Sequence, residues 1–224
     1  MKRLGKLEKS ILTISAALMV AGIFLVGLVI YNGFKGYSAF DLPDYEVTLR
    51  IKNENMNIRS EGPVRHRGAE KVLGALERLG NISKEQSRYG IIIISSSAIP
   101  QGHNSDSVYS GDPDDYSTAG FYNTEKKMIV VNDAKTADWT MYHEMGHYVD
   151  YNYMQDMRIT DTDHWLGVLE SEYLETGWDL YYSNPQEYFA ESFAAYYCKP
   201  EWLQKMCPET YAIIGGVVEE YNGR

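Results

Sequence analysis

The sequence predicts an α+β domain that follows a single N-terminal membrane-spanning helix. Three observations support this prediction. Residues 11–30 form an apolar run without a charge, short strand patterns come next, and the patterns in the C-terminal half are helical. Strands that come first in the chain and helices that come afterwards are typical of the α+β class.

The apolar run has the length of a transmembrane helix, because a helix of residues 11–30 is about 30 Å long, like a hydrocarbon core. Four basic residues precede it and only Lys35 follows closely, so the positive-inside rule places the N-terminus in the cytoplasm. A cleaved signal peptide is the alternative, although its apolar region is normally about 7–15 residues long. The anchor predicts a single-pass protein of the cell membrane with an extracellular domain, and cleavage predicts a secreted one.

We expect three parts in the chain. Residues 1–36 hold the cytoplasmic tail and the signal-anchor, residues 37–62 a tether and the first strand, and residues 63–224 the main domain. The first strand is residues 45–52, YEVTLRIK, where apolar and polar side chains alternate, as in a half-buried strand.

The elements of the main domain follow from local patterns. Residues 63–79 have apolar positions near helical spacing, and Gly80-Asn81 ends the run. The β-branched segment YGIIIISSS predicts a buried strand. Residues 100–119 are turn formers and acids, which predict a long loop. GFYNTEKKMIVVND predicts a hairpin with its turn near residues 123–126. Further helices are expected at 137–151, 163–174, 185–197 and 208–221, and Pro185 suits a first helical turn.

Composition limits the function. The chain has 224 residues, 44% of them hydrophobic, which is enough for a core. Its formal charge is −10, so we expect no nucleic-acid partner, because phosphate binding needs a basic surface. The two cysteines, Cys198 and Cys207, have no second pair with which to build a zinc knuckle. In an exported domain we favour a disulfide between them over two buried thiols.

The segment TMYHEMGHYVDYN, residues 140–152, has the pattern of a catalytic zinc site. His143 and His147 are four residues apart, so on a helix both rings project from one face and reach one metal ion. Glu144 is rotated by about 100° from His143 and can act as the base that takes a proton from water. Gly146 costs a helix about 1 kcal/mol relative to Ala, which makes sense where another backbone or the metal site approaches closely. The competing interpretation is a chance pattern on an ordinary helix.

A third ligand is needed, because catalytic zinc takes three protein ligands and keeps one open position. The metzincin pattern is excluded, since Asp150 and Tyr153 replace its Gly and His. The remaining choices are His164 and a carboxylate of NPQEYFAESFAAYY, where Glu187 and Glu191 share a helix face. Buried carboxylates are costly without compensation; zinc would compensate one, and a ligand histidine or the backbone the other. Asp150 either orients a zinc ligand or supports the next turn.

HEMGHYVD followed by PQEYFAESF resembles the catalytic domains of the anthrax lethal factor and Pro-Pro endopeptidase group of zinc metallopeptidases. The resemblance covers roughly Ile91 to the C-terminus. It implies a zincin-like domain with a small mixed sheet, Glu187 as the third zinc ligand, and Glu191 as a residue that supports the zinc ligands without binding the metal itself. It also implies a tyrosine that stabilises the oxyanion, for which we prefer Tyr181 to Tyr182.

The same resemblance gives the hairpin a role. In such proteases an edge strand above the zinc pairs with an extended substrate, and our candidate edge is Ala119, Gly120, Phe121 and Tyr122. The alternative is a hairpin that only completes the sheet.

These observations predict a membrane-anchored extracellular zinc metalloendopeptidase that binds one Zn²⁺ per chain and hydrolyses peptide bonds in extended protein substrates. Glu144 would act first as general base and then as general acid. The alternative is a catalytically silent zincin-like domain that binds a surface polymer or a partner protein.

Overall fold

The computed structural model describes residues 45–52, 56–96, 99–100, 117–134, 136–154 and 156–223, all within one compact unit, Asp44–Arg224. The predicted anchor at 11–30 and most of the predicted loop at 100–119 lie outside these residues. Within the described ranges, no helix combines the length and the apolar character needed to cross a bilayer.

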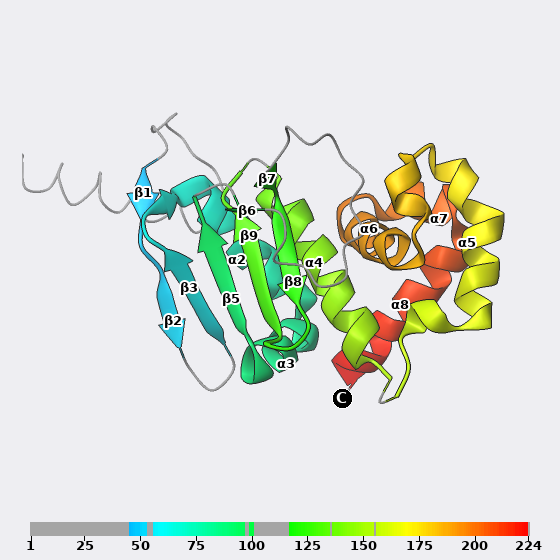
Figure 1. Ribbon diagram of the computed structural model, residues 1–224, viewed down its shortest axis with the longest axis horizontal. Helices are drawn as coiled ribbons and strands as arrows, with labels where there is room; N and C mark the ends of the chain where they lie inside the picture. The colour runs from blue at the N-terminus through cyan, green and yellow to red at the C-terminus, as the bar shows by residue number, and fades with distance from the viewer. Residues whose placement is uncertain are drawn as a thin grey trace, which may run out of the picture. The chain divides into compact units, whose positions relative to one another are not determined.

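The described strands form a central five-stranded sheet and two short strand pairs (Figure 1). The strand order in the sheet is β2 (Arg50–Lys52), β3 (Asn57–Glu61), β5 (Ile91–Ser95), β9 (Met128–Asn132) and β8 (Gly120–Asn123). β3, β5 and β9 are parallel, whereas β2 and β8 run antiparallel to their neighbours. The short pairs are β1 (Glu46–Val47) with β4 (Val64–Arg65), and β6 (Ile99–Pro100) with β7 (Ser117–Thr118).

Helices α2 (His66–Leu79), α3 (Asn81–Tyr89) and α4 (Ala137–Asn152) pack on one face of this sheet. The remaining helices follow in the chain and gather on the other side of α4. They are α5 (Asp163–Thr176), α6 (Pro185–Cys198), α7 (Pro200–Met206) and α8 (Pro208–Gly223), with short 3₁₀ turns η1 (Ile159–Asp161) and η2 (Leu180–Ser183). The predicted α+β class is therefore confirmed, with α4 as the element that joins the sheet to the C-terminal helices.

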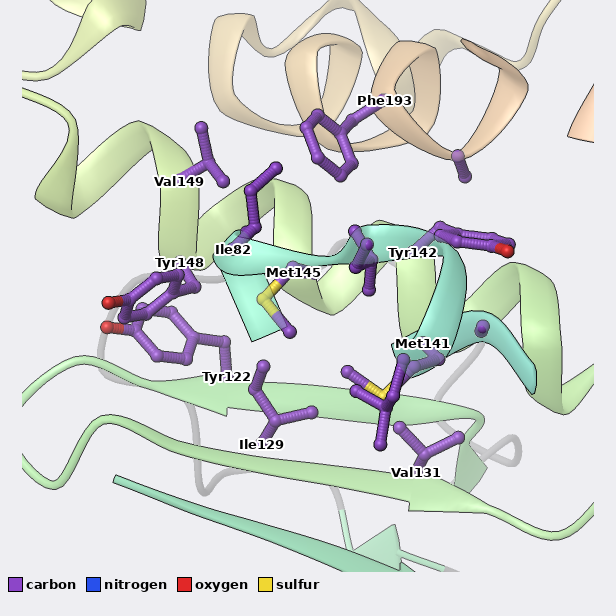
Figure 2. Packing of buried hydrophobic residues seen from close by; sticks show 14 of the residues in the cluster. Ile82, Tyr122, Ile129, Val131, Met141, Tyr142, Met145, Tyr148, Val149 and Phe193 are labelled. Atoms are coloured by element: carbon purple, nitrogen blue, oxygen red, sulfur yellow. The ribbon is translucent and has the colours of Figure 1, made fainter. Parts of the chain in front are cut away.

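The core holds α4 from both sides. Figure 2 shows the side that faces the sheet, where fully or nearly fully buried side chains include Met141, Met145, Tyr148, Tyr122, Ile129 and Val131. Burial of one large apolar side chain contributes about 1.5–3 kcal/mol, so this packing fixes the position of α4. Phe193 of α6 packs on the other side of the helix.

The close approach expected at Gly146 is present. A Cβ added to Gly146 would lie 2.8 Å from the Cα of Ala190 in α6. The glycine therefore allows the backbones of α4 and α6 to come closer than any other residue would permit.

Several predicted elements differ in detail. Residues 45–52 form two short strands instead of one, because β1 pairs with β4 while β2 pairs with β3. The first helix begins at His66 and not at Pro63, since Val64 and Arg65 belong to β4. β3, α3 and α7 were not predicted. Residues 37–62, in which one strand was expected, therefore also contain β3. This strand pairs with β2 on one side and with β5 on the other.

The disulfide favoured from the sequence is not formed. Cys198 and Cys207 are both free thiols. Cys207 is buried, and its Sγ contacts the carbonyl oxygen of Glu172 at 3.7 Å. The physical reason is that Cys207 packs inward, against α5.

Candidate metal centre

Two helices bring three potential metal ligands together. His143 and His147 lie one turn apart on α4, and Glu187 lies in the first turn of α6. Oε2 of Glu187 is 3.3 Å from Nε2 of His143 and 3.6 Å from Nε2 of His147. One ligand atom from each residue lies within 4.8 Å of the others. The predicted ligand set therefore converges on one point.

The geometry at this point fits a bound zinc ion. Oε2 of Glu187 is buried and makes no hydrogen bond of acceptable geometry within the described chain. Two ligands placed about 2.0–2.1 Å from a tetrahedral zinc ion are roughly 3.4 Å apart, which is close to both observed separations. Two imidazole nitrogens and one carboxylate oxygen also make a donor set that catalytic zinc uses, with one position left open.

His164, the other candidate third ligand, is not part of this cluster. It is exposed on α5, and the metal-ligand group found among the described residues contains only His143, His147 and Glu187. Of the two candidates for the third ligand, Glu187 lies next to the two histidines and His164 does not.

Glu144 lies beside the cluster but is not a member of it. Its side chain is buried, and burial raises the pKa of the Glu144 carboxyl, against the opposing effect of the positive charges on His143 and His147. Burial also raises the pKa of Glu187, but the charges of His147 and His143 outweigh it and hold that pKa well below its usual range. Two neighbouring carboxyls therefore differ in basicity, as separate roles for a base and a ligand require.

Glu191 contacts His143, one of the two candidate ligand histidines, as the resemblance implies. Nδ1 of His143 lies 2.9 Å from Oε2 of Glu191, one turn after Glu187 on α6. Such a carboxylate fixes the orientation of the imidazole and increases its basicity toward a metal ion.

Asp150 supports the chain after α4. Its Oδ1 accepts a hydrogen bond from the backbone N–H of Thr160 at 2.9 Å, and its Oδ2 accepts one from the Thr160 hydroxyl at 2.8 Å. Of the two roles left open by the sequence, these contacts favour support of the following turn, η1.

The two candidate tyrosines have different surroundings. The pKa of the Tyr181 hydroxyl is raised first by burial and then by its proximity to the charges of Glu187 and Glu144. The ring of Tyr182 packs against Trp178, with centroids 5.7 Å apart. Tyr181 is therefore the one whose hydroxyl reaches the ligand cluster.

The candidate edge strand lies directly against Glu144. β8 is the last strand in the sheet order, and a Cβ added to Gly120 would lie 2.9 Å from Oε1 of Glu144. The side chains of Phe121 and Tyr122 are both buried, at 7% exposure, so only the main chain of these two residues can meet a substrate. Tyr122 packs against Tyr148 and its hydroxyl accepts a hydrogen bond from Asn152.

The register of β8 shows which main-chain groups point off the sheet. The N–H of Asn132 donates to the carbonyl oxygen of Ala119 at 2.7 Å, so Ala119 and Asn132 are a hydrogen-bonded pair. Such pairs alternate along an antiparallel ladder. The main-chain groups of Gly120 and Tyr122 therefore point away from β9, at the edge that passes Glu144.

Sequence reasoning missed two contacts of this site. Trp139 donates a hydrogen bond to Glu191, which the sequence did not indicate. Gly120 was proposed for its place in a hairpin and not for its contact with Glu144. Both contacts join residues far apart in the chain, and no local pattern signals them.

Comparison with known proteins gives one family. Residues 114–217 match the family described as anthrax toxin lethal factor, N- and C-terminal domain, whereas no curated protein matches the chain. The match begins later than the resemblance expected from Ile91, and it contains β8, β9, α4 and α6 with all residues of the cluster. The resemblance expected from the sequence is thereby supported for residues 114–217, which are similar to the anthrax lethal factor family.

Proposed function

We propose that this protein is a zinc metalloendopeptidase with a zincin-like domain that hydrolyses peptide bonds in extended protein substrates. One observation carries the proposal. The nitrogens of two histidines and a carboxylate oxygen converge beside Glu144, a buried carboxylate that is not one of the ligands and that faces an edge strand. A site that only binds a metal has no need of that additional carboxylate.

His143, His147 and Glu187 would hold the zinc ion. When bound, zinc supplies Lewis acidity, which polarises the scissile carbonyl and lowers the pKa of the attacking water. Glu144 takes the proton from that water and then delivers it to the leaving amine. Its position supports both steps, because its carboxylate lies between the ligand cluster and the edge of β8. No covalent intermediate with the chain is expected.

Tyr181 is proposed to stabilise the oxyanion. A hydroxyl placed beside the reacting carbonyl can donate a hydrogen bond to the charge that develops there. The influence of the Glu187 and Glu144 charges on the pKa of this hydroxyl supports a position beside His143, His147 and Glu187.

The substrate is proposed to bind as an added strand along β8. Main-chain groups along β8, those of Tyr122 among them, would pair with an extended peptide, and this pairing needs no particular side chain of the substrate. Because Gly120 has no Cβ, the Glu144 carboxylate can lie close to β8. Ala119 and Phe121 would take part only by holding β8 on β9.

The location of the enzyme is a separate proposal that rests on the sequence. The apolar residues 11–30 and the basic residues before them favour a signal-anchor that displays the domain outside the cell. The protein would then act on peptides and proteins at the cell surface.

A peptide library tests the function. The full-length chain is incubated with an unbiased library, with and without a zinc chelator, beside E144A and a matched control, E219A, which removes an exposed glutamate of α8. We expect cleavage by the wild type and E219A, none by E144A, and bound zinc in all three. A wild type that binds zinc and cleaves nothing would favour the silent binding domain. Loss of zinc from E144A would contradict the role of Glu144 as the base.

A further inference from the structure

We propose that Trp139 is a positioning residue that sets the orientation and the tautomer of His143 through Glu191. The inference rests on the zinc site of the proposed function. It adds to that site a residue that contacts Glu191 and acts on His143 only through it. Trp139 lies four residues before His143, on the same face of α4. Both side chains reach the one carboxylate that α6 presents to them.

The contacts form a compact hydrogen-bonded group. Nε1 of Trp139 lies 3.2 Å from Oε1 and 3.1 Å from Oε2 of Glu191. Nδ1 of His143 lies 2.9 Å from the same Oε2. The Glu191 side chain is 12% exposed, so little water competes for its oxygens. The carboxylate is therefore held by two donors from successive turns of one helix.

The hydrogen bond to Glu191 determines which ring nitrogen of His143 carries the proton. An ionised carboxylate only accepts hydrogen bonds, so the proton of a neutral His143 lies on Nδ1 and the lone pair lies on Nε2. Nε2 is the atom that faces Glu187 at 3.3 Å. The indole N–H only donates, so Trp139 keeps Glu191 in the accepting role and prevents its carboxylate from rotating away from His143.

Trp139 is itself held in place. The ammonium group of Lys199 lies 5.0 Å from the centre of the indole ring, a distance at which a cation is attracted to the ring face. Lys199 is the residue between α6 and α7. The indole is thus fixed between α4 and the C-terminal end of α6, and its N–H is aimed at Glu191.

The test uses W139F in the full-length chain, because this variant removes the N–H and keeps an aromatic ring under Lys199. Zinc affinity is measured by competition with a chelator. Outer partners of metal ligands typically contribute 10–100-fold to affinity, and we expect a loss of about 10-fold, at the lower end. NMR of the zinc-loaded protein gives a second result: the Nδ1–H proton of His143 exchanges with water faster in W139F than in the wild type.

W202F is the matched control. Trp202 lies on α7, where its ring packs on Trp178 with centroids 5.7 Å apart, and we expect its replacement to leave both measurements unchanged. Wild-type affinity and exchange in W139F would overturn the proposal, and so would an equal loss in W202F, because the effect would then be one of general packing. Neither measurement depends on peptide cleavage, so a chain that binds zinc but cleaves nothing would refute the peptidase alone. A wild type that binds no zinc would refute both.

Discussion

Replacement of Gly146 by alanine tests whether the contact between α4 and α6 sets the metal site. The added Cβ would meet the Cα of Ala190 at 2.8 Å and the Cβ of Phe193 at 3.0 Å. Carbon atoms in good contact are about 3.5–4.0 Å apart, so the helices must separate by roughly 0.7 Å or more. Overpacking of this kind costs about 1–3 kcal/mol. Since the obstacle is backbone, we expect about 3 kcal/mol, reduced by the roughly 1 kcal/mol that alanine gains over glycine in a helix.

The net loss in the free energy of unfolding is therefore about 2 kcal/mol. The separation of the two helices also affects the metal site. α6 carries Glu187 and Glu191, while α4 carries the two histidines. Metal-ligand distances tolerate only about 0.2 Å, so a separation of the helices must also weaken zinc binding.

The assay is urea unfolding of full-length G146A with zinc and with chelator, together with chelator competition for affinity. G74A is the matched control, since an added Cβ on this exposed residue of α2 meets nothing within 4 Å. G74A should gain up to about 1 kcal/mol from helix propensity alone. A G146A protein as stable as the wild type, with unchanged zinc affinity, would refute the reasoning.

Two further predictions concern single side chains. Y181F should lower kcat on a fluorogenic peptide by about 10²–10³-fold with little change in KM, because it removes an oxyanion donor, whereas Y182F should lose less than tenfold; equal losses would contradict the assignment. Burial, followed by the charge of Asp138, raises the pKa of Cys198 to about 11 from 9.0. The reactive thiolate is then roughly 100-fold scarcer at pH 8 than in a thiol of ordinary pKa. Alkylation of Cys198 should therefore be slow at pH 8 and accelerate up to about pH 11, and a rate at pH 8 equal to that of the unfolded chain would count against this.

The helices of the site could be predicted because their signals are local. α4 was expected at 137–151 and α6 at 185–197, and each ends only one residue later. Asn184 accepts a hydrogen bond from the N–H of Gln186 at 2.9 Å, which caps α6 just before the proline that marked its start. Such signals lie within a few residues of the helix end and need no tertiary contact.

α3 could not be predicted in this way, because its buried face is largely polar. Ser83, Gln86 and Ser87 are buried together with Ile82. The Ser83 hydroxyl donates to the carbonyl of Leu76 at 2.8 Å, and the Gln86 amide donates to the carbonyl of Lys127 at 2.7 Å. These partners come from other elements, so a pattern of apolar residues gives no sign of the buried face.

Within the site, spacing alone indicated His143, His147 and Glu144, while the choice of Glu187 over His164 needed a resemblance to a known family. Gly146 was a correct signal because a helical glycine is costly unless a close approach requires it. The contact of Trp139 with Glu191 joins residues 52 positions apart. The sequence does not distinguish a tryptophan that only packs from one whose indole N–H also donates a hydrogen bond, and only the fold shows the difference.

The charges at the contact of α4 and α6 argue for a cation and against a purely structural ion-pair network. Glu144, Glu187 and Glu191 are all buried or nearly so, and the basic groups that lie closest to Glu187 and Glu191 among the described residues are two imidazoles. Two neutral imidazoles leave three carboxylates uncompensated, and even two protonated ones would leave one. Buried charge without compensation is costly, whereas a dication held by His143, His147 and Glu187 would offset most of it and leave Glu144 as the base. Three buried carboxylates beside two histidines are therefore unfavourable without a metal ion, and they are the groups that a hydrolytic zinc site requires.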